Sequence, residues 1–172
     1  RLARMRMGRG TEPDVEVGPL VNEAGRDKVI ELVDDAVAKG AKILVGGHPG
    51  PGRGWFYEPT VLDGVPGDAR LLREEIFGPV APVTAFDSEE AATAAANDTE
   101  FGLVAYLYTR DLGRAFRVAE ALETGMVGLN QGMVSNPAAP FGGVKQSGIG
   151  REGGPEGIHE YLSVKYVALN LS

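Results

Sequence analysis

The stretch EEIFGPV occupies residues 74–80 and carries the first distinctive chemistry of this sequence. Two acidic residues precede an apolar pair, and a Gly-Pro dipeptide then favours a turn. Glu74 and Glu75 are neighbours, so on an extended backbone their side chains point to opposite sides and cannot flank one substrate. At most one of these carboxylates is therefore expected to serve a binding site.

A second distinctive stretch, PFGGVKQSGIGRE at residues 140–152, is rich in glycine, whose backbone can approach a ligand closely. Gly148, Gly150 and Gly153 match the G-x-G-x-x-G pattern of dinucleotide-binding loops. However, no strand runs directly into the pattern, no βαβ unit follows it, and no acidic residue lies about 20 residues further on. We therefore do not interpret it as a pyrophosphate site.

Around these stretches the hydrophobic pattern predicts alternating helices and strands. The predicted helices cover residues 22–39, 88–96 and 112–123, and the predicted strands cover residues 42–45, 57–62, 80–86, 103–109, 126–130 and 163–170. We expect residues 42–45 to form a buried strand and Gly125 to end the third helix. Crossover helices join parallel strands, so the order predicts one α/β domain with a mostly parallel sheet and flanking helices.

Composition narrows the possible functions. The formal charge of −7 over 172 residues argues against nucleic-acid binding, and no apolar run is long enough to span a membrane. The basic cluster Arg1, Arg4, Arg6 and Arg9 could be a transit peptide or a phosphate-binding arm, but the end of a helix explains it more simply. With no cysteine, the chain offers no thiol nucleophile or disulfide, and we expect a cytoplasmic protein.

Two other patterns have simple structural explanations. His48 and His159 lack partners at metal-ligand spacing, so we predict no metal site. The sequon Asn97-Asp98-Thr99 is common by chance, and we interpret it as an ordinary loop.

The stretch at residues 74–80 resembles the EEIFGP signature of aldehyde dehydrogenases, and residues 140–152 resemble the glycine-rich segment near the end of that family's catalytic domain. The segment GMVGLN at residues 125–130 precedes the second block in the order the family shows, and the resemblance covers essentially the whole chain. It implies the C-terminal portion of the catalytic domain, residues 1–160, followed by an oligomerisation strand at residues 161–172. It also implies a homodimer or homotetramer.

The chemistry implied by the resemblance is oxidation of an aldehyde with NAD or NADP. A cysteine thiolate attacks the carbonyl, and water activated by a glutamate hydrolyses the thioester. We expect both residues, and the dinucleotide-binding half, to precede Arg1, so this chain alone is predicted to be inactive.

Carried over by motif, Glu75 would hydrogen-bond the nicotinamide ribose and Phe77 would pack beside the nicotinamide, although composition alone favours a core aromatic at position 77. Phe141 would line the substrate tunnel. Ser135 matches a position that is often aromatic in members preferring apolar aldehydes, and its hydroxyl favours a polar substrate tail; alternatively it bonds its own backbone. Glu152 would relay protons or pair with Arg151 as structural support.

The surrounding residues resemble the branch of the family that oxidises succinate semialdehyde, in which such a serine helps hold the distal carboxylate. Glutarate semialdehyde or a broad range of aldehydes remain alternatives. A different class of function, a non-catalytic α/β module that binds a partner subunit, is also compatible with the missing thiol.

Overall fold

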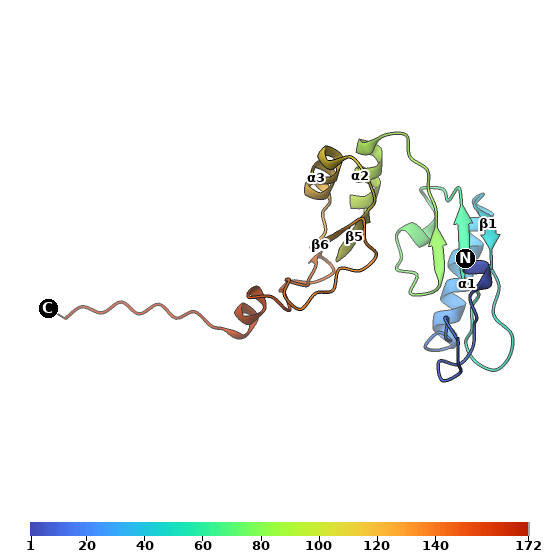
Figure 1. Ribbon diagram of the computed structural model, residues 1–172, viewed down its shortest axis with the longest axis horizontal. Helices are drawn as coiled ribbons and strands as arrows, with labels where there is room; N and C mark the ends of the chain where they lie inside the picture. The colour runs from blue at the N-terminus through green and yellow to red at the C-terminus, as the bar shows by residue number, and fades with distance from the viewer. Residues whose placement is uncertain (172) are drawn as a thin grey trace. The chain divides into compact units, whose positions relative to one another are not determined.

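A computed structural model describes residues 1–171 of the chain. The chain forms two compact units, Arg1–Phe86 and Asp87–Ser172, which we describe separately (Figure 1). Both units combine helices with short strands, so the predicted α/β class is confirmed. Within residues 1–171, two strand pairs are parallel and two are antiparallel. The three-stranded sheet of the first unit is mixed, whereas the second unit has one parallel pair and one antiparallel pair.

The first unit is built around helix α1 (Glu23–Ala38), as the amphipathic pattern predicted. Asn22 caps its start by accepting a hydrogen bond from the Gly25 N–H at 2.8 Å. At its end the N–H of Ala41 donates to Ala36 O at 2.9 Å and Gly40, at φ 113°, donates to Val37 O at 3.0 Å. This pair of bonds is a Schellman cap, which satisfies the last carbonyls. A single 3₁₀ turn, η1 (Leu2–Arg4), precedes the helix, where the basic cluster predicted a helix end.

The sheet of the first unit has the order β1 (Lys42–Val45), β2 (Thr60–Asp63) and β3 (Val80–Pro82). The expectation that β1 is buried is wrong: it is an edge strand, and Leu44 is 60% exposed. A short apolar run indicates a strand but does not say which side of it is covered. Pro82 lies in the other edge strand, where its missing N–H costs no ladder bond, as expected for a proline in a strand.

A hydrophobic core joins α1 to this sheet. Its buried members come from the helix, from β2 and from the loops on either side of β2 and after the helix: Val29, Leu32, Val33, Ala36, Ala41, Tyr57, Leu62, Val65, Ala69 and Leu71. Tyr57 is 1% exposed, and burial raises the pKa of its phenol to about 12. Thr60 is fully buried, and its hydroxyl donates to Glu58 O and accepts from the Gly47 N–H, both at 2.8 Å. The turns that flank the sheet are thereby tied to the core.

The second unit contains a β-α-β unit of the predicted kind. Strand β5 (Val104–Leu107), helix α3 (Leu112–Ala121) and strand β6 (Met126–Leu129) follow one another, and the two strands pair in parallel. Helix α2 (Glu89–Asn97) contacts α3, and Figure 1 shows both helices on the same side of β5 and β6. Both helices are capped at their start, because Ser88 accepts from the Ala91 N–H and Asp111 accepts from the Arg114 N–H. Strands β4 (Phe101–Gly102) and β7 (Val144–Lys145) form a short antiparallel pair.

Two details of α3 differ from the prediction. The helix ends at Ala121, and Gly125 does not cap it. Gly125 instead lies against another backbone segment, because a Cβ built on it would be 1.9 Å from Gly142 O. Leu112 and Phe116 share the apolar face of the helix with Ala115, but only Ala115 of these three is buried. The helical period identifies an apolar face, but not what covers it.

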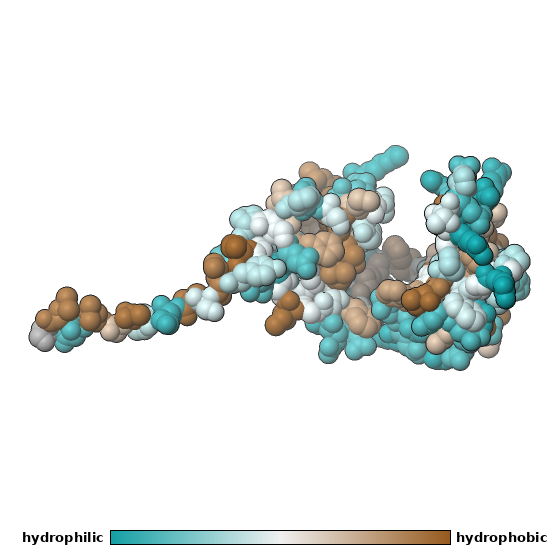
Figure 2. All heavy atoms as spheres, turned by 90° about the horizontal axis from the view of Figure 1, so that it is seen from below, coloured by the Kyte–Doolittle hydropathy of each residue, from teal (hydrophilic) through white to brown (hydrophobic). Residues whose placement is uncertain are grey.

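The chain closes with a 3₁₀ helix, η3 (Glu156–Tyr161), and an extended run at residues 162–171. The run is not a hydrogen-bonded strand within this chain, so the strand expected at residues 163–170 is absent here. Its side chains are exposed, and Figure 2 shows hydrophobic residues in brown interleaved with hydrophilic ones along it. Within residues 1–171, no helix is long and apolar enough to cross a bilayer.

Candidate functional site

The first candidate segment lies between η2 (Arg70–Leu72) and β3. Glu74 forms an ion pair with Arg70, with Nε to Oε1 at 2.7 Å and Nη2 to Oε2 at 3.2 Å. The Arg70 guanidinium holds the pKa of Glu74 below its ordinary value. The Glu74 carboxylate is therefore engaged by a side chain of η2.

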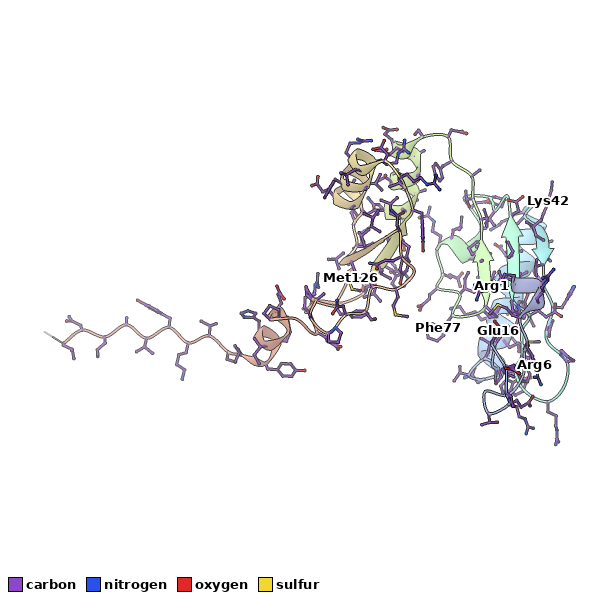
Figure 3. All side chains as sticks on the ribbon, in the orientation of Figure 1. Arg1, Arg6, Glu16, Lys42, Phe77 and Met126 are labelled. Atoms are coloured by element: carbon purple, nitrogen blue, oxygen red, sulfur yellow. The ribbon has the colours of Figure 1, made fainter. Side chains whose placement is uncertain are left out.

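Glu75 and Phe77 are both presented on the surface of this segment. Phe77 is 76% exposed, and its side chain, labelled in Figure 3, projects from the turn. Its φ of 50° is unusual for a bulky residue and indicates a backbone held by its surroundings. Lys28 of α1 donates its ammonium hydrogen to the carbonyl of Glu75. A Cβ added to Gly78 would be 2.5 Å from Val29 Cγ2, so the turn packs directly on the helix.

A concave surface of about 480 Å³ opens beside this turn. Its lining is mostly apolar and comes from the start of α1, the segment before it and the turn itself: Pro19, Leu20, Val21, Gly25, Lys28, Ile76 and Phe77. Phe77 is therefore not a core aromatic, which was the alternative that composition favoured. Glu75 is not among the lining residues, and its exposed carboxylate, two residues from the ring, can offer a hydrogen-bond acceptor to a ligand that stacks on Phe77.

The second candidate segment starts at the carboxyl ends of β5 and β6. Asn130 follows β6 at φ 54°, and its side chain forms two hydrogen bonds with Thr109, which follows β5. The loop at residues 131–140, called the substrate loop below, leaves the sheet there and carries Ser135. Ser135 is exposed, and among residues 1–171 its hydroxyl has no hydrogen-bond partner. Asn136 forms the local turn instead, accepting from the Ala138 N–H at 3.0 Å.

Phe141 and Glu152 lie side by side. The Phe141 N–H donates to Glu152 O at 2.7 Å, and the Glu152 N–H donates to Phe141 O at 2.8 Å. This bridge closes the glycine-rich segment into a loop. The guanidinium of Arg151 fills the loop and donates to the carbonyls of Gly143 and Gly150, at 2.8 and 2.7 Å, rather than to Glu152. The alternative of an Arg151–Glu152 pair is therefore wrong, and the Glu152 carboxylate is exposed.

A second concave surface, of about 360 Å³, is lined by both members of this bridge. Leu103 also lines it, and the remaining lining residues come from the glycine-rich loop and from η3, among them Ser147, Arg151, Glu160 and Tyr161. Ser135 is not among them. The structure thus brings Phe141 and Glu152 together and places Ser135 on the loop that precedes them.

Asn130 was not singled out from the sequence. The signal that could have identified it is an asparagine directly after a strand, because asparagine adopts positive φ more readily than other residues with a side chain. The sequon begins in a helix rather than in an ordinary loop, because Asn97 is the last residue of α2. Its amide donates to Ala121 O at 2.8 Å and accepts from the Glu123 N–H at 2.9 Å. No cluster of acidic or histidine side chains suited to a metal occurs within residues 1–171.

Comparison with known proteins identifies this arrangement. Residues 1–167 match the model of the aldehyde dehydrogenase family. The chain belongs to the aldehyde dehydrogenase family. It spans about a third of the length of the curated relatives it matches.

Two relatives and one solved structure illustrate the similarity. A succinate-semialdehyde dehydrogenase of Paenarthrobacter nicotinovorans is 57% identical over 162 residues, which cover 94% of this chain and 36% of that protein. A glutarate-semialdehyde dehydrogenase of Pseudomonas aeruginosa is 52% identical over 168 residues, covering 98% of this chain and 35% of that protein. The crystal structure of succinate-semialdehyde dehydrogenase from Burkholderia pseudomallei superposes with a TM-score of 0.93 at 55% identity, covering 96% and 34% of the two chains. Over almost its own whole length, this aldehyde dehydrogenase segment thus shares the fold of about a third of that enzyme.

Proposed function

We propose that this chain is part of an NAD(P)-dependent aldehyde dehydrogenase that oxidises a semialdehyde, with succinate semialdehyde as the preferred substrate. The observation that carries the proposal is the exposed hydroxyl of Ser135, which has no partner among residues 1–171 and follows the carboxyl ends of two parallel strands. Ligands of α/β sheets bind at that edge. A hydroxyl there can donate to the distal carboxylate of a semialdehyde, and the names of similar proteins support the same substrate class.

The nicotinamide side of the active site is assigned to the first unit. The residues fit such a ligand: Glu75 offers an exposed carboxylate to the ribose hydroxyls, and Phe77 offers an exposed ring to one face of the nicotinamide. The cofactor, when bound, accepts hydride from the substrate. We assign to this chain the role of orienting the nicotinamide ring, and the positive φ of Phe77, unusual for a bulky residue, supports the assignment.

The substrate side is assigned to the second unit. Phe141 would form an apolar wall and Glu152 an exposed carboxylate able to take up or release protons. The chain contains no cysteine, so we assign the thiol nucleophile and the general base to the remainder of the enzyme. The 172-residue chain by itself is expected to show no turnover. Membership of the family does not favour the alternative of a non-catalytic partner-binding module.

The test uses the full-length enzyme that carries this segment. Steady-state rates with succinate semialdehyde, glutarate semialdehyde and hexanal, each with NAD⁺ and with NADP⁺, should show the highest kcat/KM for succinate semialdehyde. A higher kcat/KM for glutarate semialdehyde would move the assignment to the activity named for the 52% identical relative. Preference for hexanal would contradict the role given to Ser135 and indicate a broad-range enzyme.

Assembly is part of the same proposal. We assign residues 1–160 to the catalytic domain and residues 161–172 to a strand that adds to a sheet of another subunit, giving a homodimer or homotetramer. The exposed hydrophobic side chains of residues 162–171 support this, because an extended apolar segment without a partner promotes aggregation. Deleting residues 162–172 from the full-length enzyme should reduce its mass in size-exclusion chromatography with light scattering. An unchanged mass would contradict the assignment. A cytoplasmic location completes the proposal and can be tested by fractionation.

A further inference from the structure

We propose that Asn130 is a positioning residue that orients the substrate loop, so that Ser135 can select aldehydes with an acidic tail. The inference rests on the proposed function, because Ser135 is the residue through which Asn130 would act.

The geometry around Asn130 joins the end of the sheet to the start of the loop. Its N–H donates to Leu107 O at 2.8 Å, which continues the parallel pairing one residue beyond β6. Its side chain then makes the hydrogen bonds that the backbone of a strand would make: Oδ1 accepts from the Thr109 N–H and Nδ2 donates to Thr109 O, each at 2.9 Å. Both polar atoms of the amide are satisfied. The main chain is therefore free to leave the sheet at φ 54° while the pairing is completed by the side chain.

Asparagine is the residue type that meets both requirements. A left-handed φ is strained for most side chains and tolerated by Gly, Asn and Asp. Glycine can adopt the angle but has no amide, and aspartate keeps the acceptor but cannot donate to Thr109 O. The side chain and the backbone angle of Asn130 therefore act together to set the direction in which the substrate loop starts.

The loop is anchored again beyond Ser135. Pro137 O accepts from the Gly154 N–H at 3.0 Å, which ties the loop to the glycine-rich segment. On the near side, Val134 packs over the sheet, since a Cβ on Gly128 would be 3.0 Å from Val134 Cγ1. Ser135 is exposed between these two anchors. The position of its hydroxyl is thus set by the anchored loop residues on either side rather than by a hydrogen bond of its own. Asn130 anchors the start of that loop at the sheet.

The experiment measures discrimination between substrates in the full-length enzyme. The selectivity is the ratio of kcat/KM for succinate semialdehyde to kcat/KM for hexanal. Asn130→Gly keeps the backbone angle and removes the clamp, and it should lower the selectivity about tenfold, the scale of one lost hydrogen bond to a charged group. Asn130→Asp should lower it in the same direction. The KM for the cofactor should stay within twofold of its value in the unmodified enzyme.

A double-mutant cycle with Ser135→Ala separates positioning from stability. If Asn130 acts through Ser135, the selectivity of the Asn130→Gly/Ser135→Ala enzyme equals that of Ser135→Ala alone. Equal losses for both aldehydes, or independent effects that multiply, would overturn the proposal in favour of a structural role. If Asn130→Gly does not fold, the same cycle is run with Asn130→Asp. If Ser135→Ala leaves the selectivity unchanged in an active enzyme, the substrate role of Ser135 fails and the inference falls with it.

Discussion

Phe141 and Glu152 exchange two main-chain hydrogen bonds, at 2.7 and 2.8 Å, and thereby close a loop filled by the guanidinium of Arg151. The resemblance to aldehyde dehydrogenases gave the two residues separate roles, one at the substrate and one in proton transfer. The bridge makes them parts of one rigid element, because neither backbone can shift without breaking a bond to the other. Changes at this loop should therefore affect both roles together.

The first prediction concerns Phe77. Phe77→Ala in the full-length enzyme should weaken cofactor binding by about 2 kcal/mol, the contribution of covering a phenyl side chain. The melting temperature should change little, because the ring is exposed and alanine shares the strain of the positive φ. Cofactor titration by fluorescence and thermal unfolding provide the two measurements. An unaltered Kd for the cofactor would exclude Phe77 from the nicotinamide site.

The second prediction concerns Ser135. Ser135→Ala should raise the KM for the semialdehyde through loss of a hydrogen bond to its carboxylate, at a cost of roughly 1.5 to 3 kcal/mol. The KM for hexanal should not rise, because hexanal has no charged tail. Steady-state kinetics at saturating cofactor measures both values. A KM for the semialdehyde equal to that of the unmodified enzyme would remove Ser135 from the substrate site.

The third prediction concerns Gly125. Gly125→Ala should destabilise the enzyme by about 3 kcal/mol or more, because the new methyl group would meet Gly142 O at 1.9 Å. Gly132→Ala in the same unit is the matched control. A Cβ added at Gly132 would have the Tyr108 hydroxyl as its nearest neighbour, at an ordinary contact distance of 3.7 Å. Denaturant unfolding compares the two variants. Equal midpoints would show that the two backbones separate easily.

The fourth prediction concerns Glu89, which joins α2 to α3 by accepting from Arg114 Nε at 2.9 Å and from Arg117 Nε at 3.1 Å. Hydrogen bonds from Arg117 and Arg114 lower the pKa of Glu89 from its ordinary 4.5. The carboxylate therefore stabilises the fold at neutral pH, and this contribution is lost as pH falls from 4.5 through the lower folded pKa.

Glu89→Gln should accordingly lower the melting temperature at pH 7, and the difference from the unmodified enzyme should shrink below pH 4.5. Glu90→Gln is the matched control, because it removes a charge from the same helical turn without a hydrogen bond to either arginine. Thermal unfolding across this pH range gives the answer. A difference that stays constant with pH would show that the ion pair contributes nothing.

Local chemistry determines the parts of the fold that the sequence predicts well. Helix α1, predicted at residues 22–39, depends on one short stretch of sequence, because Asn22 and Gly40 cap it and Leu32 lies on its apolar face. The polar caps at Ser88 and Asp111 are local in the same way. Such features depend on residues three or four positions apart, and the pattern records them directly.

Features that depend on distant segments were not predictable in this way. Leu44 and Phe116 have apolar side chains at the right spacing, yet nothing in the spacing says whether a second layer covers them. The tight contact of Gly125 with Gly142 and the clamp of Asn130 on Thr109 join residues far apart in sequence. The candidate residues themselves came from motif resemblance, and their geometry came from the structure.

The double use of the Asn97 amide bears on how the enzyme should be produced. Its Nδ2 holds Ala121 O, and its Oδ1 receives the Glu123 N–H, so the ends of α2 and α3 meet through this one side chain. In a secretory host, oligosaccharyltransferase can act on the Asn-Asp-Thr sequon of the nascent chain before the helices assemble. A glycan on Nδ2 would then stand where Ala121 must approach. Bacterial expression avoids this competition between sugar transfer and folding.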